Sequence, residues 1–338
     1  MKVSALLLVF TSAFGSSFML TPIVAGTLRR AGILRLDYHK PEPRPWVPPL
    51  GGIPVFAAAS IGTAAAYVCF PDYRLELTAH WLSVAIAFTI GVVDEFVVLK
   101  GKTKTLLTLL TLLPVVAAWM VGGGRIVLGK PFVPLLGSLR ITIIYWLLLP
   151  LAIAGPANVV NMLDVMNGVM PSTTLLAFGA TLAAAWILNS ELGVIVSVIW
   201  LGALAGYLPY NTYPASIFNG DSASLAVGAA LGSAAVLCRL EFIVLVALLP
   251  HLLNGFLVIK SAGLREHRAH KDRPIKVEPD GTLRANTSPL APMSLTRLLL
   301  LFSGEAKEQD VVEAFIFLEF VAALLSVVSA VMVRLRIC

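Results

Sequence analysis

The chain has 338 residues, of which 58% are hydrophobic and only 13% are charged, with a formal net charge of +6. In soluble proteins about a quarter of the residues are charged. The composition therefore excludes an ordinary soluble domain and indicates an integral membrane protein. In a membrane protein, basic residues act as topology signals and phosphate contacts. The positive charge therefore does not indicate a nucleic-acid partner.

Apolar runs of about 17–25 residues, the length that crosses a bilayer, recur along the chain. We expect an all-α integral membrane fold with about ten transmembrane helices, at residues 3–28, 51–69, 81–99, 105–121, 141–157, 169–188, 194–208, 223–237, 241–260 and 311–333. We interpret residues 1–338 as a single polytopic domain, in which residues 261–310 form a loop before the last span.

The Lys and Arg residues are divided unequally between the two sides of such a ten-span arrangement. The side with loops 29–50, 100–104 and 260–310 carries 17 of them, and the other side carries 8. The positive-inside rule places the first side in the cytoplasm and both termini outside. Every polar cluster described below falls on this cytoplasmic side, which favours one composite site at the cell membrane.

The third span ends in the adjacent carboxylates Asp94 and Glu95, and Lys104 follows ten residues later. Adjacent carboxylates suit Mg²⁺, which prefers oxygen ligands, and one of them could act as a general base or orient an attacking phosphate. The alternative is a pair of solvated charges at the membrane edge. Lys104 could likewise hold a phosphate or only obey the positive-inside rule.

Four polar residues recur every third position after the fifth span: Asn158, Asn161, Asp164 and Asn167. On a helix they would form one polar stripe that shifts gradually around the helix axis, because a spacing of three is shorter than a full turn. Polar groups in a membrane are costly and usually functional, and amide groups can bind a metal, a nucleobase or a sugar. The alternative is hydrogen bonding between helices.

Further along, Gly220-Asp221-Ser222 precedes an apolar run, and Phe218 lies just before it. Asp221 or Ser222 could simply cap the helix, yet a helix N-terminus also favours phosphate. Phe218 could stack on a base or pack against its neighbours.

The loop of residues 261–310 begins with dense basic residues and continues as a predicted β-hairpin with Pro279-Asp280-Gly281 as its turn. Clustered Arg, His and Lys suit a diphosphate, whereas anionic lipid and topology are the alternatives. The basic residues considered as ligands are Arg268, His270, Lys271 and Arg273.

In order along the chain, these segments resemble the polyprenyl-phosphate N-acetylhexosamine-1-phosphate transferases of glycosyltransferase family 4. The resemblance covers nearly the whole chain, and residues 129–137 and the hairpin after Pro274 are most similar to the archaeal and eukaryotic dolichyl-phosphate enzymes. It is carried by Asp37–Lys40, Pro49–Ile53, Gly91–Glu95, Asn158–Gly168, Asn219–Ser222 and the basic loop. The chain departs from the family at Glu95, where the family usually has aspartate, and in the basic loop, which has neither the bacterial triple-histidine nor the eukaryotic Arg-His-Arg pattern.

The resemblance implies transfer of a sugar-1-phosphate from a UDP-sugar to a polyprenyl or dolichyl phosphate with release of UMP, and the sugar we expect is GlcNAc. It implies Mg²⁺ as cofactor, with Mn²⁺ as an alternative, and is compatible with a homodimer. Asn161 and Asp221 would be the metal ligands, and Asp94, Glu95 and Lys104 the catalytic group. The implied substrate-binding residues are Asn158, Asn167, Phe218, Arg268, His270, Lys271 and Arg273.

A different class of protein also fits intramembrane polar residues, namely a multi-span transporter that uses the polar cluster as its substrate site. Transporter sites lie near the middle of the membrane, whereas the polar residues here gather at span ends. The sequence therefore favours an enzyme at the membrane interface.

Overall fold

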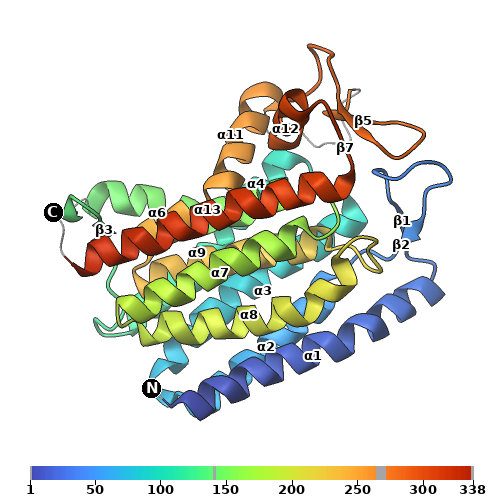
Figure 1. Cartoon of the computed structure of the whole chain (residues 1–338). Coiled ribbons are helices and arrows are strands. Elements are labelled where there is room, and N and C mark those ends of the chain that lie inside the picture. Colours follow the sequence, from blue (N-terminus) through green and yellow to red (C-terminus); the bar gives the residue numbers. More distant parts are fainter. Residues whose placement is uncertain (1, 140–141, 264–271, 336–338) are drawn as a thin grey trace.

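The computed structural model describes residues 2–139, 142–263 and 272–335, and shows a bundle of long helices that run between two ends (Figure 1). Its helices are α1 Val3–Arg30, α2 Gly52–Cys69, η1 Pro71–Tyr73, α3 Arg74–Val97, α4 Gly101–Thr108, η2 Leu109–Leu112, α5 Leu113–Val121, α6 Thr142–Leu163, α7 Val169–Ile187, α8 Glu191–Asn211, α9 Gly220–Cys238, α10 Glu241–Ala247, α11 Leu249–Ala262, α12 Leu295–Ser303 and α13 Glu308–Arg334. Its strands are β1 Arg35–Leu36, β2 Trp46–Val47, β3 Phe132–Val133, β4 Gly137–Ser138, β5 Ile275–Val277, β6 Leu283–Ala285 and β7 Glu305–Ala306.

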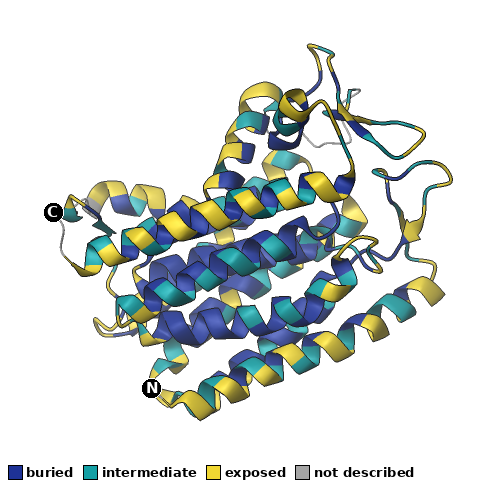
Figure 2. Ribbon diagram, viewed as in Figure 1, coloured by how far each residue is buried: buried dark blue, intermediate teal, exposed yellow. Residues whose placement is uncertain are grey.

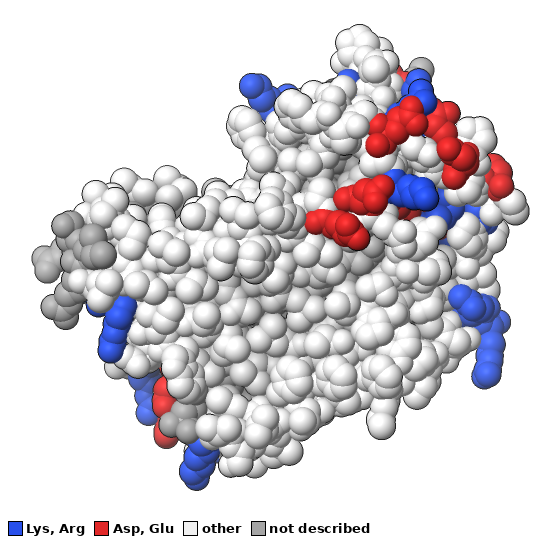
Figure 3. Space-filling view, in the orientation of Figure 1, with Lys and Arg blue, Asp and Glu red and all other residues white. Residues whose placement is uncertain are grey.

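The expected membrane fold is confirmed. Within the described residues, nine helical segments are long and apolar enough to cross a membrane, and the bent pair α10–α11 brings the number to ten. The start of α1 and the end of α13 lie at the same end of the bundle, opposite β1, β2 and β5 (Figure 1). On the face shown in Figure 3, charged side chains gather toward the two ends, and an uncharged band separates them.

Two of the predicted spans are broken and not straight. The span expected at 241–260 is the pair α10 and α11, which are bent by 71° relative to each other. Pro250 stands in the first turn of α11, where its missing N–H removes the hydrogen bond that would continue α10. The span expected at 105–121 changes from α-helix to 3-10 helix and back, with Pro114 at the start of α5.

The prediction of a helical polar stripe is wrong for its second half. Helix α6 ends at Leu163, so Asp164 and Asn167 lie in the turn that leads to α7. Gly168 precedes α7 with φ +86°, in the left-handed region that glycine adopts easily. Because the chain turns here, Asp164 and Asn167 do not continue the helical face of Asn158 and Asn161.

The predicted hairpin is confirmed. Strands β5 and β6 pair antiparallel with Ile275 opposite Ala285, and β7 adds a third strand beside β6. The turn between them closes with a hydrogen bond from the Gly281 N–H to the Glu278 carbonyl, and the Asp280 carboxylate accepts from the Thr282 N–H. The small sheet lies at the same end of the bundle as β1 and β2 (Figure 1).

Helix α9 is the buried centre of the bundle. It packs mainly against α3 and α6, and almost all of its surface is covered, whereas α1 and α13 keep an exposed outer stripe (Figure 2). Small residues let its backbone approach its neighbours closely, as is common between membrane helices. Its first turn, which carries Asp221, is therefore held at a fixed position against α3.

We expect Gly91→Ala to destabilise the protein. A Cβ atom at Gly91 in α3 would lie 2.4 Å from the Asp221 carbonyl oxygen and 2.5 Å from the Ser222 Cα, so α3 and α9 would have to separate. Overpacking of this kind costs about 1–3 kcal/mol. The measurement is thermal unfolding in detergent. Gly179→Ala in α7, where a Cβ would meet nothing within 4 Å, is the matched control and should not lower the unfolding temperature.

Candidate active site

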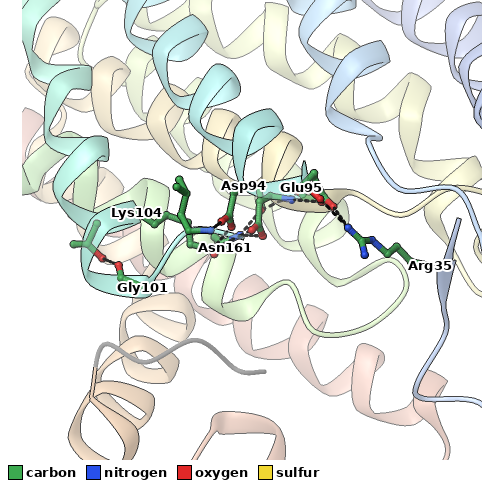
Figure 4. Close-up of polar contacts among 11 residues, drawn as sticks. Arg35, Asp94, Glu95, Gly101, Lys104 and Asn161 are labelled. Atoms are coloured by element: carbon green, nitrogen blue, oxygen red, sulfur yellow. Dashed lines mark hydrogen bonds and ion pairs between the residues drawn. The ribbon is translucent and has the colours of Figure 1, made fainter. Parts of the chain in front are cut away.

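A lysine between two carboxylates forms the centre of the site (Figure 4). The ammonium of Lys104, on α4, lies 2.8 Å from Asp94 Oδ2 and 3.0 Å from Asp221 Oδ2. Asp94 is in the last turn of α3 and its other oxygen accepts from the Leu99 N–H. A buried charge needs a partner of opposite sign, and Lys104 has two, from two different helices.

Asn161 joins the same group from the last turn of α6. Its amide nitrogen donates to Asp221 Oδ1 at 2.6 Å and to the Ser224 hydroxyl at 2.8 Å. The helices α3, α4, α6 and α9 therefore all contribute polar side chains at this point. The structure brings together Asp94, Lys104, Asn161 and Asp221, four of the candidate site residues.

Glu95 turns toward a different part of the site. Its Oε1 accepts from the backbone N–H of Asp221 at 3.1 Å. Arg35, in β1, donates to the Glu95 carbonyl oxygen at 2.7 Å, and its guanidinium lies 3.8 Å from the carboxylate (Figure 4). Adjacent residues on α3 thus contact the side chain and the backbone of Asp221 separately.

A polar cavity of about 240 Å³ opens beside this cluster. Asp221 contributes to its wall and keeps 31% of its side chain exposed, whereas Asp94 is only 3% exposed and lies behind it. The remaining wall comes from β1 and the residues after it, from the α6–α7 turn and from the start of α9. The lining residues are Leu36, Asp37, Tyr38, His39, Asn161, Asp164, Val165, Met166, Asn167, Asn211, Phe218, Asn219, Gly220 and Asp221.

Asn167 and Phe218, predicted to face the nucleotide, both lie in this wall. The Asn167 side-chain nitrogen donates to Asp37 Oδ2 at 3.1 Å, and its backbone N–H donates to Glu308 Oε1 at 3.2 Å. Lys40 is buried between Asp37, at 3.1 Å, and Glu308, at the start of α13. These contacts connect the loop between α1 and α2 (the first loop), the α6–α7 turn and α13 around one side of the cavity.

The basic loop is only partly described. Arg273 lies over the ring of Tyr38, with 4.2 Å between the guanidinium carbon and the ring centroid, a favourable cation–π geometry. Because Tyr38 lines the cavity, Arg273 is close to the predicted substrate site. Arg268, His270 and Lys271 fall outside the described residues.

Asn158 is not brought to the cavity. Its amide nitrogen donates to the Thr108 hydroxyl at 2.8 Å and to the Ala154 carbonyl at 2.7 Å. It thus connects α6 to α4, and this geometry matches the alternative in which a polar side chain joins two membrane helices.

The sequence assigned no role to several residues of the site. Asp37, Tyr38 and His39 line the cavity, and Lys40 and Glu308 form the buried pair behind it. The segment Asp37–Lys40 was one of those that carry the family resemblance, which was a usable signal. Glu308 is one acidic residue at the start of the last span, and nothing in the sequence relates it to a lysine 268 positions earlier.

Two titratable groups of the cavity wall are kept uncharged or partly uncharged near neutral pH. Burial lowers the pKa of His39 to about 4, although Asp37 acts in the opposite direction. Burial raises the pKa of Asp164 to about 7, and the negative charges of Asp221 and Glu95 add to this, while the hydrogen bond from Asn219 opposes it. The Asn219 amide donates to Asp164 at 2.7 Å.

Asp164→Asn should therefore change the pH dependence of stability. The raised pKa of Asp164 means that its contribution to stability is complete below about pH 4 and is lost as the pH rises through about 7. The asparagine keeps an acceptor for Asn219 and cannot ionise. We expect the unfolding temperature of the variant, relative to the unchanged protein, to rise by several degrees between pH 5 and pH 8 in EDTA. A difference that stays constant over this range would contradict the prediction.

The groups that could hold a metal are oxygen atoms. Within the described part of the chain, no three His, Cys, Asp or Glu side chains converge as a ready metal site. Asp221, however, offers a carboxylate to the cavity, and Asn161 offers an amide. The ammonium group of Lys104 lies between Asp94 and Asp221, so this position already accepts a positive charge. Mg²⁺ is commonly bound through one or two carboxylates together with water and substrate phosphates, so these residues fit such an ion.

Sequence comparisons agree with this arrangement. A family model described as glycosyl transferase family 4 matches residues 77–239, which include Asp94, Lys104, Asn161 and Asp221. The chain is 30% identical over 250 residues to the phospho-N-acetylmuramoyl-pentapeptide-transferase of Anoxybacillus flavithermus, covering 69% of this chain and 75% of the relative. It is 28% identical over 253 residues to the protein of that name from Halalkalibacterium halodurans, covering 71% and 77%. A third such transferase, from Bacillus subtilis, is 36% identical over 102 residues, covering 30% and 32%.

The fold and the site define a polytopic membrane enzyme whose polar residues gather where the helices end. The chain belongs to glycosyl transferase family 4, in agreement with the resemblance noted from its motifs. Transfer of a phosphosugar to a polyprenyl phosphate is the activity that this membership supports.

Proposed function

We propose that the protein transfers a sugar-1-phosphate from a UDP-sugar to a dolichyl or other polyprenyl phosphate and releases UMP. The sugar-1-phosphate that we propose is GlcNAc-1-phosphate. The observation that carries the proposal is the convergence of Asp94, Lys104, Asn161 and Asp221 beside a polar cavity whose wall includes Asn167 and Phe218. A reaction between two phosphate anions needs positive charge at the point where they meet. The cluster is built around such a charge.

Asp221 and Asn161 are the proposed ligands of Mg²⁺, with Mn²⁺ as an alternative. Asn161 presents its amide nitrogen to Asp221, so rotation of the amide would present the oxygen that a metal requires. When bound there, Mg²⁺ would offset the negative charge on the donor diphosphate. Removal of divalent cations with EDTA should therefore abolish the transfer.

The chain's own residues would guide the reaction as follows. Lys104 holds a phosphate oxygen and reduces the repulsion between the lipid phosphate and the donor. Both oxygens of Asp94 already accept hydrogen bonds, from Leu99 and Lys104, which supports a role in orienting that lysine toward the acceptor phosphate. Phe218 and Asn167 would bind the nucleotide in the cavity. An oxygen of the lipid phosphate attacks the β-phosphorus, the bond to the UMP oxygen breaks, and UMP leaves.

The proposed site is on the cytoplasmic face of the cell membrane. The unequal distribution of Lys and Arg supports this orientation, and the start of α1 and the end of α13 lie at the opposite end of the bundle (Figure 1). A cytoplasmic site would also have direct access to water-soluble nucleotide sugars. The polar residues lie at helix ends and not at mid-membrane depth, which favours the enzyme over the transporter alternative.

One observation favours a second donor. The relatives described above are named phospho-N-acetylmuramoyl-pentapeptide-transferases, so a UDP-linked muramoyl pentapeptide is the competing candidate. Support for GlcNAc comes from residues 129–137 and the segment after Pro274, which resemble the dolichol branch and fold as the hairpins β3–β4 and β5–β6. The basic loop also lacks the triple histidine of the bacterial enzymes.

The test is a transfer assay with the purified protein in detergent. Labelled UDP-GlcNAc, UDP-GalNAc and the UDP-muramoyl pentapeptide are each offered with dolichyl or undecaprenyl phosphate and Mg²⁺. We expect UMP release and labelled lipid with UDP-GlcNAc, and a preference for dolichyl phosphate. Product from the pentapeptide donor alone would replace GlcNAc by the second candidate, and no UMP release from any pair would contradict phosphosugar transfer.

A further inference from the structure

Glu95 and Asp94 are neighbours in the sequence but point to different targets. Successive residues of an α-helix are about 100° apart around its axis. Asp94 contacts the lysine of the cluster, whereas Glu95 reaches the first turn of α9 and accepts the Asp221 N–H at 3.1 Å. The backbone N–H groups of a first helical turn have no partner within their own helix.

Helix α9 lacks a cap from its own preceding residue. Asn219 is the N-cap residue, and its side chain makes no capping hydrogen bond; its amide nitrogen donates instead to Asp164. Glu95 therefore caps α9 from a different helix. A negative charge at this end also interacts favourably with the helix dipole.

The space around the Glu95 carboxylate is closely fitted. A Cβ atom added to Gly220 would lie 2.4 Å from Glu95 Oε1, and Gly220 has φ +66°. The carboxylate thus lies directly against the backbone of the residue before Asp221. Only glycine allows both this backbone conformation and this approach.

Arg35 fixes Glu95 from the opposite side. Its guanidinium donates to the Glu95 carbonyl oxygen at 2.7 Å, near the C-terminal end of α3, where a positive charge is favourable. It also lies 3.8 Å from the carboxylate. Arg35 belongs to β1, directly before the cavity-lining residues Leu36 and Asp37, so one side chain connects the cavity wall to the cap of α9.

We propose that Glu95 is a positioning residue that fixes Asp221 by accepting a hydrogen bond from the Asp221 backbone N–H. Arg35 in turn holds Glu95 in place. In this role Glu95 neither takes a proton nor binds the metal. The inference rests on the proposed function for its activity readout. The argument depends on length: an aspartate at this position would be short by about 1.5 Å, one carbon–carbon bond. A glutamine would keep both the length and the acceptor oxygen.

The test compares Glu95→Gln with Glu95→Asp. A base or a metal ligand needs the negative charge, so the aspartate variant should then be the more active one. A positioning residue needs reach, so the glutamine variant should retain about fivefold more kcat/KM than the aspartate variant, the size expected from one lost cap hydrogen bond. The Mg²⁺ concentration for half-maximal rate should rise in Glu95→Asp and change less in Glu95→Gln. The reverse order of the two variants would overturn the proposal.

Hydrogen exchange gives a readout that does not depend on activity. Deuterium uptake by residues 219–224 should increase in Glu95→Asp and stay near the unchanged protein in Glu95→Gln. Equal uptake in both variants would refute the cap even if their activities differ. If the protein proves inactive with every donor, the proposed function fails while the exchange result still decides the role of Glu95.

Arg35 supplies the second comparison. Arg35→Gln should increase uptake at residues 219–224 in the same direction as Glu95→Asp, and the double variant should add little, because both act on one contact. Arg30→Gln, an exposed arginine at the end of α1, is the control and should leave uptake unchanged. Additive effects of Arg35→Gln and Glu95→Asp would show that Arg35 does not act through Glu95.

Discussion

Asp221→Ala should abolish UMP release while the protein stays folded. Asp221 carries the carboxylate that both faces the cavity and contacts Lys104 and Asn161. Its removal would take away the proposed charged metal ligand, and loss of one well-placed stabilising group at a reaction centre costs about a hundredfold to a thousandfold in rate. The measurement is UMP release with UDP-GlcNAc, dolichyl phosphate and Mg²⁺.

The fold should survive because the partners of Asp221 keep other contacts. Lys104 still pairs with Asp94, and Asn161 still donates to Ser224. The control is Asp72→Ala, an exposed carboxylate near the other end of α3, which should keep full activity. Full activity in Asp221→Ala, with normal thermal unfolding, would remove Asp221 from the proposed metal site.

Lys104→Met should cost most of the activity and at the same time make the protein more responsive to Mg²⁺. The ammonium is the positive group between Asp94 and Asp221. Without it, two carboxylates face each other without compensation, and breaking a buried ion pair in this way costs about 3–5 kcal/mol. A divalent cation that binds between them would recover part of that loss, because binding to the folded state stabilises it.

The measurement is the increase in unfolding temperature when Mg²⁺ is added, with transfer measured in parallel. We expect a larger increase for Lys104→Met than for the unchanged protein, together with a loss of transfer of about a hundredfold. Lys102→Met is the matched control, since Lys102 lies on the same helix and is exposed. An equal Mg²⁺ response in all three proteins would show that Lys104 does not occupy a cation position.

The spans and the centre of the site could be predicted because each shows as a local difference between apolar and polar residues along the sequence. Apolar runs of bilayer length identify the helices, and Asp94, Asn161 and Asp221 stand out as polar residues at their ends. The 71° bend before α11 could not be predicted in the same way, since hydropathy gives the length of a span and carries no information about direction. Pro250 was the only local signal.

The rest of the site depends on contacts between distant segments. The first loop contains many charged and polar residues, so composition does not separate Asp37 and Lys40 from their solvated neighbours. Only the tertiary fold shows that Lys40 meets Glu308 and that Arg273 meets Tyr38. The contact of Glu95 also depends on the tertiary fold, because its partner is the backbone N–H of Asp221. No sequence pattern identifies a backbone group as a partner.

The pairing of Lys40 with Glu308 has a consequence for biosynthesis. The two residues are 268 positions apart, and a chain is made from its N-terminus while earlier segments already fold. The loop between α1 and α2 is therefore synthesised long before the ribosome has produced the start of α13. The contacts that support one side of the cavity are completed only when the last helix enters the membrane, so nascent chains that have inserted most of the bundle would still lack the Lys40–Glu308 pair behind the cavity wall.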